Sequence, residues 1–567
     1  MKKGSIFVAF HSGWSKELAS RYDEIVTPER LRGLIKAGSV EEASELNRKL
    51  SLITDRAGRR VSKIVNFKGF ELWWINYDNL MYKFSLPYTE YRSLLEYLKD
   101  FSNIYLYKPP HLDIFKYFLD AHECRYVIKL EKQFSKKFPI GVLFQVALSI
   151  PFLFWLKLRN PKLLVWTSDR FDPPRDHNFR MKFIYEELKA RKINFMEFIR
   201  SMEPSPIVFE HCLKRRRPVI YSYAIVTLAR ALRSLFESQR NLETFSRPKV
   251  GASPEEIFWH KIATHYAKNF RSDIWAIKTI KFILKFIGIK SAIIIGAINR
   301  NFPEVLACKL SGIPTVGIQH GLHPKYYFVS DFMHEFDGDK TLSVDKYGLW
   351  SEWWKEYYLK YSKAYKPEQL YVSGLMRPLE KIPNSKSQTL NHGQLKVLFV
   401  AEELAAPEEV LPYLEALLED KNVSVYIKFR PYKDGFEAWL KENHPEIIKN
   451  FDAEKILKIS MHEAIALSDV VVGSHSAGVF EAALQLKPFV LFRTEKWGDF
   501  LGLISLNLGD IVAGTPEEFI AKVKRSKSIP QDGLKKIQEL FFGNPYQNGS
   551  RWVVDQAEEA LKGCFTK

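Results

Sequence analysis

Residues 470–478 read VVVGSHSAG, a run of three valines that ends in a glycine and small hydroxyl residues. A short, continuous apolar run is typical of a strand buried on both faces of a parallel sheet. A serine next to the following apolar pattern is a common amino-terminal cap of a helix. The stretch therefore predicts a strand over 470–473 and a helix over 477–486, one unit of a doubly wound α/β fold.

The same alternation extends along the chain on both sides of this stretch. Downstream of residue 395 we predict strands over 397–401, 423–429 and 489–492, and helices over 408–418 and 461–467. Upstream we predict strands over 292–296, 314–318, 342–345 and 370–373, with helices over 303–311 and 350–361. Strands that alternate with helices favour parallel sheets of the α/β class.

The first 290 residues carry a weaker pattern. Short strand-like runs occur at 6–10, 70–75, 104–108, 163–167 and 218–223, with a helical pattern at 183–191. Residues 383–394 are polar and rich in turn formers, which indicates a connector between domains. We therefore predict two Rossmann-like doubly wound domains facing a central cleft. We expect a first domain with insertions over residues 1–380, a linker over 381–395 and a second domain over 396–550, and a helix in 551–567 can cross back.

Composition limits the classes of function. The chain has 567 residues, of which 46% are hydrophobic and 26% charged, which excludes a disordered protein. Its four cysteines form no CxxC pair, so neither a zinc site nor a disulfide framework is indicated, and a reducing, cytoplasmic setting fits. The net charge of +18 favours an anionic partner such as nucleotide phosphates, a lipid-pyrophosphate acceptor or an anionic membrane surface. No motif indicates nucleic acid.

Residues 138–156 form an uncharged run between lysines and an arginine. Its length is near that of a membrane-crossing helix, but Pro151 and the positive charge at both ends argue against spanning. Two interpretations remain. The run is either an in-plane helix or hairpin at the inner face of a membrane, or two buried elements broken at Pro151.

Gln319-His320-Gly321 follows the strand predicted over 314–318. Ligands of open parallel sheets bind at the carboxyl ends of the strands, so a histidine here can take a proton from an acceptor hydroxyl. His323 is a competing candidate for this base, and a histidine that only caps the loop is the structural alternative.

The turn after 470–473 supplies Ser474, His475 and Ser476, and Glu481 follows one helical turn later. A helix amino-terminus with hydroxyl groups suits a diphosphate, and a carboxylate can accept hydrogen bonds from ribose hydroxyls. Ordinary capping serines and a surface glutamate are the alternative. Lys428 and Arg430, at the end of another strand, can neutralise a leaving phosphate, or simply lie on an exposed strand edge.

Two other segments carry charged clusters. Asp337-Gly338-Asp339 has the spacing of a metal-binding motif but does not follow an apolar strand, so we predict a solvated turn and no metal site. Arg175 lies in a charged segment after the strand over 163–167, where it can contact an acceptor or form loop salt bridges.

Taken together, the segments around His320, Arg430 and Ser474 resemble the GT-B glycosyltransferase families that build bacterial surface polymers, over about residues 292–492. These families are the CDP-glycerol glycerophosphotransferases, the capsular Kdo transferases and the sialyl- and polysialyltransferases. The resemblance implies that His320-Gly321 supplies the base and that Ser474, Ser476 and Glu481 hold the nucleotide. Where these families have a His-Pro motif, this chain has Arg430-Pro431.

We therefore expect an inverting, metal-independent transferase. It would move a sugar or a glycerophosphate-like unit from a nucleotide-activated donor to a surface glycan or lipid-linked acceptor, with no cofactor. The domain over 1–380 would be the acceptor side, with Gln319, Gly321, His323 and Arg175 as candidates, and the domain over 396–550 would bind the nucleotide donor. A sugar-nucleotide 2-epimerase of the same fold and a non-catalytic nucleotide-binding scaffold at the membrane are the alternatives. The expected location is the cytoplasm, with the inner face of the membrane left open.

Overall fold

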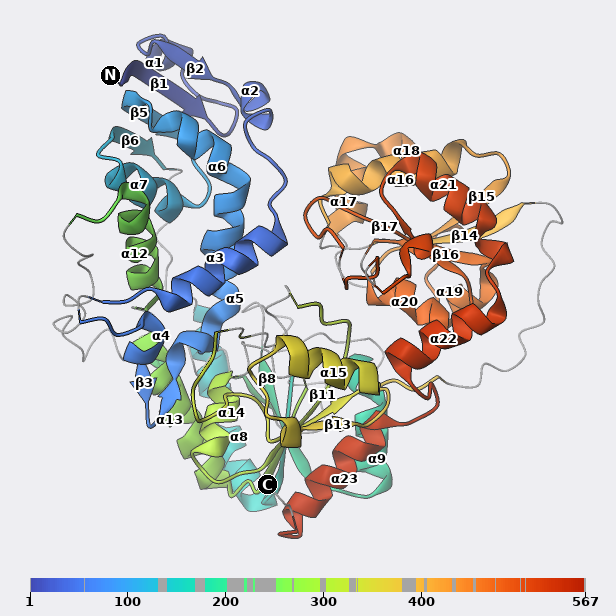
Figure 1. The fold of residues 1–567 in the computed structure, drawn as a ribbon. Helices are drawn as coiled ribbons and strands as arrows, with labels where there is room; N and C mark the ends of the chain where they lie inside the picture. Colours follow the sequence, from blue (N-terminus) through green and yellow to red (C-terminus); the bar gives the residue numbers. More distant parts are fainter. Residues whose placement is uncertain are drawn as a thin grey trace.

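The computed structural model contains three α/β units, each built on an all-parallel sheet (Figure 1). It describes residues 2–55, 57–130, 140–168, 179–200, 219–221, 228–229, 251–267, 270–295, 302–325, 333, 335–379, 394–401, 405–430, 435–451, 455–474, 476–499, 501–504 and 506–564. The predicted connector at 383–394 lies almost entirely outside these residues.

The central unit is a seven-stranded sheet in the order β13-β12-β11-β10-β7-β8-β9. Its strands are β7 (Leu163–Ser168), β8 (Phe195–Arg200), β9 (Val219–Tyr221), β10 (Ser291–Ile294), β11 (Thr315–Ile318), β12 (Lys346–Leu349) and β13 (Leu370–Val372). Counted in chain order, the arrangement is 7-6-5-4-1-2-3. This is the strand order of a Rossmann fold with one strand added. Successive strands are added on one side of β7 up to β9 and on its other side from β10 onward, so the strand order reverses between β7 and β10.

Alternate residues of β7 face different helical layers. Leu164 and Trp166 belong to the core formed with α13 (Phe270–Ile287) and α14 (Phe302–Lys309). Leu163 and Val165 pack instead with residues of α9 (Lys182–Ala190) and α23 (Gly549–Leu561). Because side chains of a strand alternate between faces, an uninterrupted apolar run such as 163–166 is what a sheet covered on both sides requires.

The last helix, α23, belongs to the central unit although the chain reaches it from the other domain. Figure 1 shows it beside α9 in the lower unit. Val553, Val554 and Ala557 lie in the core beneath the sheet. At the surface, the guanidinium of Arg191 pairs with Asp555 at 2.6 Å and with Glu558 at 3.0 Å.

The second Rossmann-like domain is a five-stranded sheet in the order β15-β14-β16-β17-β18. Its strands are β14 (Leu395–Val400), β15 (Val423–Lys428), β16 (Val470–Gly473), β17 (Phe489–Phe492) and β18 (Val512–Ala513). A parallel bridge from Ile427 to Ile456 places one further segment outside β15. With that segment the order, counted along the chain, is 3-2-1-4-5-6. The first six strands of the central sheet have this same order, and in the second sheet the reversal falls between β14 and β16.

A third sheet lies in the amino-terminal 130 residues, in the order β2-β1-β5-β6. Its strands are β1 (Lys3–Ala9), β2 (Glu24–Val26), β5 (Phe101–Tyr107) and β6 (Arg125–Lys129). The helix α12 (Pro254–Ala267) packs against α7 (Leu112–Ala121), and one apolar core continues from this unit into the central one. The region predicted as one domain over 1–380 therefore holds two separate sheets.

Most elements predicted after residue 290 are confirmed. The helix α19 (Met461–Leu467) and the strands β16 and β17 have the predicted bounds. The strand predicted over 342–345 is wrong, since the strand begins at Lys346. Asp345 serves the turn instead, because its carboxylate accepts hydrogen bonds from the backbone N–H and the hydroxyl of Thr315, at 2.9 and 2.8 Å.

The strand predicted over 70–75 is also wrong. Only β4 (Phe70–Glu71) is extended, and Leu72–Asn76 forms a 3-10 helix. Trp73 and Trp74 are both fully buried. Two consecutive buried residues fit a helix packed on several sides better than a strand with one solvated face.

The uncharged run near residue 150 is a single helix, α8 (Ile140–Arg159), with Pro151 inside it. Both a hairpin and a break into two elements at Pro151 are therefore wrong, while an in-plane helix remains compatible with the structure. Pro151 lies on the exposed side of α8, where water can satisfy the carbonyl left without its helical donor. Among the described residues no helix has the length and apolar character needed to cross a bilayer.

Candidate active site

The predicted functional side chains lie where strands of the two Rossmann-like sheets end. Gln319 to His323 follow β11 in the central sheet, and Ser474 and Ser476 follow β16 in the second. Parallel strands present all their carboxyl ends at one edge, where ligands of this fold class bind. The position of β16, directly at the reversal of strand order, makes its end the expected ligand site of the second domain.

Gln319 fixes the shape of the loop after β11. Its side-chain amide donates to the carbonyl of Gly321 at 3.0 Å, and its side-chain oxygen accepts from the backbone N–H of Trp350 at 3.2 Å. The indole N–H of Trp350 donates in turn to the Gln319 carbonyl at 2.9 Å. Since Gln319 is fully buried, these bonds clamp the loops after β11 and β12 together and set the position of His320.

His320 is half-buried and lies beside the second histidine of the loop. The ring centroids of His320 and His323 are 5.4 Å apart, with the rings edge to face. His323 is buried and shares a hydrogen bond of 2.6 Å between its Nδ1 and the hydroxyl of Tyr358. Burial, with the charge of Arg180 as a smaller cause, lowers the pKa of His323 to about 3. A group with so low a pKa is a weak base at neutral pH.

The turn after β16 brings the helix α20 (Ala477–Leu484) close against the sheet. A Cβ on Gly473 would lie 2.6 Å from Val479 Cγ2 and 2.9 Å from the carbonyl oxygen of Val400. Only glycine allows so close an approach of the backbone without a shift of these atoms. Ser476 caps the helix by accepting from the N–H of Gly478, and Ser474 is buried at the strand end.

Glu481 lies on α20 and is paired with two segments from outside its own helix. Its carboxylate lies 2.8 Å from the guanidinium of Arg377, which follows β13 of the central sheet. The ring Nε2 of His462, on α19, lies 3.7 Å from the other carboxylate oxygen. The side chain of Glu481 is 12% exposed. The residue predicted to bind ribose therefore also connects the two Rossmann-like domains.

Lys428 is directed to the chain beside its own strand. Its ammonium donates to the backbone carbonyl of Ile459 and, at 3.4 Å, to that of Leu457. Burial lowers the pKa of Lys428. Arg430 is half-buried just beyond the end of β15. The two predicted cations thus differ in their surroundings. The ammonium of Lys428 holds the neighbouring segment around Leu457 and Ile459, whereas Arg430 lies just beyond the strand end.

A helix of the second domain, α22 (Gln531–Phe542), bridges the two sides of the candidate site. Toward the second domain, the side-chain amide of Gln538 donates to the carbonyl of Leu484, at the end of α20, at 2.8 Å. Toward the central unit, the hydroxyl of Ser351 donates to Leu540 and the indole of Trp354 to Phe541, at 2.7 and 2.9 Å. The helix α22 therefore contacts both α20 of the second domain and the start of α15 (Glu352–Tyr361) of the central unit.

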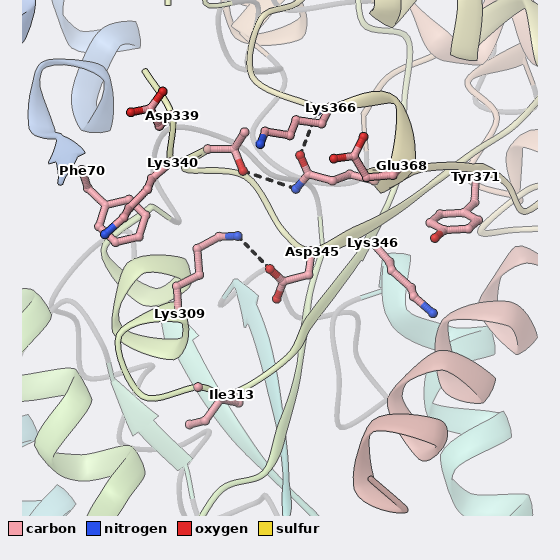
Figure 2. A pocket seen from close by; sticks show the side chains of 13 residues that line it. Phe70, Lys309, Ile313, Asp339, Lys340, Asp345, Lys346, Lys366, Glu368 and Tyr371 are labelled. Carbon is pink, nitrogen blue, oxygen red and sulfur yellow. Dashed lines mark hydrogen bonds and ion pairs between the residues drawn. The ribbon is translucent and has the colours of Figure 1, made fainter. Parts of the chain in front are cut away.

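A pocket of about 310 Å³ opens at the opposite, amino-terminal edge of the central sheet (Figure 2). Figure 2 shows Lys309 paired with Asp345 beside the start of β12 and Lys346. Four lysines line the pocket together with three carboxylates: Lys309, Lys340, Lys346 and Lys366, with Asp339, Asp345 and Glu368. The charges nearly balance, and none of the predicted site residues lines this pocket.

The remaining residues named from the sequence are the Asp-Gly-Asp motif, Arg175 and His475. Asp337 of the Asp-Gly-Asp motif forms ion pairs with Lys63 at 2.6 Å and Arg60 at 3.3 Å. Arg175 and His475 lie outside the described residues. Their roles stay predictions.

Three residues of the site had no role assigned from the sequence. Trp350 and His462 carry no motif that would mark them. Arg377 follows a predicted strand, but its partner Glu481 is 104 positions away. No local pattern links residues so far apart, so only folding reveals the pair.

Comparisons with known proteins give a likeness among solved structures only. No family model matches the sequence, and no curated protein matches it. The Staphylococcus aureus MnaA–UDP co-structure is 12% identical with a TM-score of 0.42, covering 72% of this chain and 98% of its own. The UDP-GlcNAc 2-epimerase from Neisseria meningitidis bound to UDP-GlcNAc is 15% identical (TM-score 0.43, 70% and 99%). A glycosyltransferase from Rickettsia africae is 13% identical (TM-score 0.39, 71% and 99%).

Proposed function

We propose that this protein is an inverting glycosyltransferase that uses a nucleotide-activated donor and needs no bound metal. One observation carries the proposal. The carboxyl edge of one sheet with Rossmann strand order bears a base candidate, and that of the other bears a candidate turn for an anion. Arg377 and Glu481 join the two. This arrangement suits a reaction that needs a donor and an acceptor in one cleft.

The donor would bind to the second domain. The amino-terminus of α20 follows the strand at the reversal of strand order, and the positive end of the helix dipole favours a diphosphate there. Ser474 and Ser476 would add hydroxyl donors, and Glu481 would accept hydrogen bonds from the ribose. Arg430 and the amino-terminus of α20 would supply the positive charge that a leaving nucleotide needs, which makes a metal ion unnecessary.

The acceptor would enter beside the loop after β11. Of the two histidines there, His323 is buried, bonded to Tyr358 and low in pKa. His320 is half-buried and follows the strand end directly. We therefore assign the base to His320 and a positioning role to His323.

The step is a single displacement. The acceptor oxygen forms a bond to the anomeric carbon of the donor while the bond from that carbon to the nucleotide phosphate oxygen breaks. The acceptor proton passes to the ring nitrogen of His320, and the electron pair of the broken bond leaves with the nucleotide. Attack from the face opposite the leaving group inverts the anomeric configuration. The transferred group would be a sugar, and the acceptor a glycan or lipid-linked molecule. For a glycerophosphate-like unit the acceptor oxygen would attack the phosphorus of that unit instead. The bond from this phosphorus to the bridging oxygen would then break, and the nucleoside monophosphate would leave with the electron pair.

A thermal-shift screen tests the donor half of the proposal. A ligand at a hundred times its Kd stabilises the native state by about 2.7 kcal/mol, so CMP, CDP, UDP, GDP and their sugars can be compared directly. We expect one nucleotide to stabilise the protein equally with and without EDTA. The effect should fall by about half or more in Glu481→Ala and be kept in Glu415→Ala, an exposed glutamate on α16 (Pro407–Glu419) of the same domain.

Incubation of the protein with the stabilising nucleotide-sugar and no acceptor tests the reaction class. A transferase leaves the sugar configuration unchanged under these conditions. Conversion of the donor to its 2-epimer would identify an epimerase and overturn the transfer proposal. Stabilisation by a nucleotide without turnover of any acceptor would identify a binding scaffold.

A further inference from the structure

The exposed face of α8 is apolar along its described length. Leu143, Ala147, Ile150, Pro151, Phe154 and Leu158 are all exposed, at the spacing of one helical face. Leu143 and Ile150 are about half exposed, at 50% and 51%, Phe154 is 62% exposed and Leu158 84%. At a rise of about 1.5 Å per residue the stripe is about 22 Å long. An isolated exposed leucine needs no explanation, but a continuous apolar stripe marks an interaction surface.

A second helix widens this surface. Phe282 of α13 is 69% exposed and lies against Phe286, whose ring in turn contacts Phe154 with centroids 5.9 Å apart. The opposite side of α8 is anchored, since Leu156 is buried in the core. We call the exposed residues of α8 listed above, together with Phe282, the α8 face. It is a fixed part of the central unit.

Positive charge surrounds the α8 face. The ammonium of Lys157 lies 5.5 Å from the Phe286 ring centroid, and the guanidinium of Arg159 lies 4.9 Å from that of Trp155. Lys278 and Lys285 lie on the exposed side of α13. The sequence of α8 contains no acidic residue, and the one acidic residue of α13, Asp273, is buried.

We infer that the α8 face docks on an anionic lipid bilayer, with α8 in the plane of the interface. Apolar side chains in the middle, cations at the rim and a tryptophan beside an arginine are the pattern of helices that lie in the headgroup region. A second copy of this chain fits less well, because each copy carries a net charge of +18 and the same cations would face each other. The contact with lipid does not depend on the proposed function. Only the statement that the acceptor is lipid-linked rests on the proposed function.

Sedimentation of the full-length protein with vesicles tests this inference. We expect binding to phosphatidylcholine vesicles containing phosphatidylglycerol and weaker binding to phosphatidylcholine alone. Raising the salt from about 0.1 M to about 1 M should weaken binding, because salt screens the rim charges. Leu158→Asp, at the most exposed position, and Phe154→Asp should each lower vesicle binding by about tenfold. Lys278→Glu with Lys285→Glu should remove the preference for anionic lipid.

Ile504→Asp is the matched control. Ile504 is 49% exposed in the second domain, far from α8 in the chain, and its substitution should leave vesicle binding unchanged. Equal thermal unfolding and equal nucleotide-induced stabilisation of all variants would show that each is folded and that the nucleotide site is separate. Failure of the wild-type protein to bind anionic vesicles would overturn the inference. So would light scattering that shows a wild-type dimer converted to a monomer by Leu158→Asp.

Discussion

The guanidinium of Arg377 and the carboxylate of Glu481 lie 2.8 Å apart across the boundary between the two Rossmann-like domains. Arg377 follows β13 of the central sheet, whereas Glu481 lies one turn into the helix after β16. Because Glu481 is mostly buried and Arg377 about one third exposed, the pair can orient the carboxylate that we assign to the ribose. Under the proposed function, domain contact and nucleotide binding would both depend on the Glu481 side chain.

This pairing predicts non-additive effects on nucleotide affinity. Glu481→Ala should weaken nucleotide binding by about 10- to 150-fold, since hydrogen bonds to a charged group contribute about 1.5–3 kcal/mol. Arg377→Ala should weaken it in the wild-type background by leaving the carboxylate without its support, but should add little in the Glu481→Ala background. Calorimetric titration of the wild type, the two single variants and the double variant with nucleotide gives the coupling free energy between Arg377 and Glu481. Strictly additive effects would mean that Arg377 contacts the nucleotide independently.

His320→Ala should lower the rate of transfer by about 10²- to 10⁴-fold, the usual contribution of a general base. Nucleotide binding should be unchanged, because His320 belongs to the other domain. The measurement is kcat with saturating donor, compared with His11→Ala, a histidine on the exposed surface of the amino-terminal unit. Retention of the full rate would show that another group takes the acceptor proton.

Gln319→Ala should destabilise the protein by about 1–3 kcal/mol, because it leaves the buried backbone N–H of Trp350 without an acceptor. It should also lower kcat by releasing the loop that carries His320. Chemical denaturation and steady-state rates measure the two effects. Gln394→Ala removes an exposed bond, to the carbonyl of Lys421 at 2.8 Å, and should change neither. An unchanged rate in Gln319→Ala would separate the clamp from catalysis.

Burial of His323 predicts a loss of stability in acid. Its pKa is about 3 in the folded protein and 6.5 in the unfolded chain. Between these values the unfolded state binds more protons, so stability falls as the pH drops below 6.5, by at most about 1.4 kcal/mol per pH unit. His323→Gln should reduce this slope between pH 6.5 and 5, measured by denaturation. Burial also lowers the pKa of His260, but this histidine contributes equally to the wild type and to His323→Gln. An unchanged slope in His323→Gln would therefore contradict the lowered pKa of His323.

Gly473→Ala should destabilise the second domain by about 1–3 kcal/mol, the usual cost of overpacking. The added methyl group would meet the Val400 carbonyl oxygen and the Val479 side chain, and the displaced helix should bind nucleotide less well. Gly533→Ala is the control. It lies within α22, where the nearest atom to a new Cβ is 4.0 Å away, so it should stabilise by up to about 1 kcal/mol. Thermal denaturation and nucleotide titration distinguish the two. Equal stability of both variants would show that the turn after β16 tolerates a side chain.

The sequence by itself determined the local elements and the ends of strands that carry the site. Apolar runs with turn formers at both ends predicted β16 and β17 with their observed bounds, because strand and helix periods are properties of neighbouring residues. The same patterns placed His320 and Ser474 at strand ends. They failed at 70–75, where two buried tryptophans favour a 3-10 helix, because an apolar run has no period that distinguishes strand from helix.

Only the tertiary structure decided which residues act together. It paired Arg377 with Glu481, used Gln319 to clamp Trp350, and placed His323 in the interior beside Tyr358. It also made α8 one helix with an exposed apolar face, although its composition alone fitted buried elements equally well. The physical reason is that burial, ion pairing and pKa depend on neighbours brought together by packing, and those neighbours are distant in the chain.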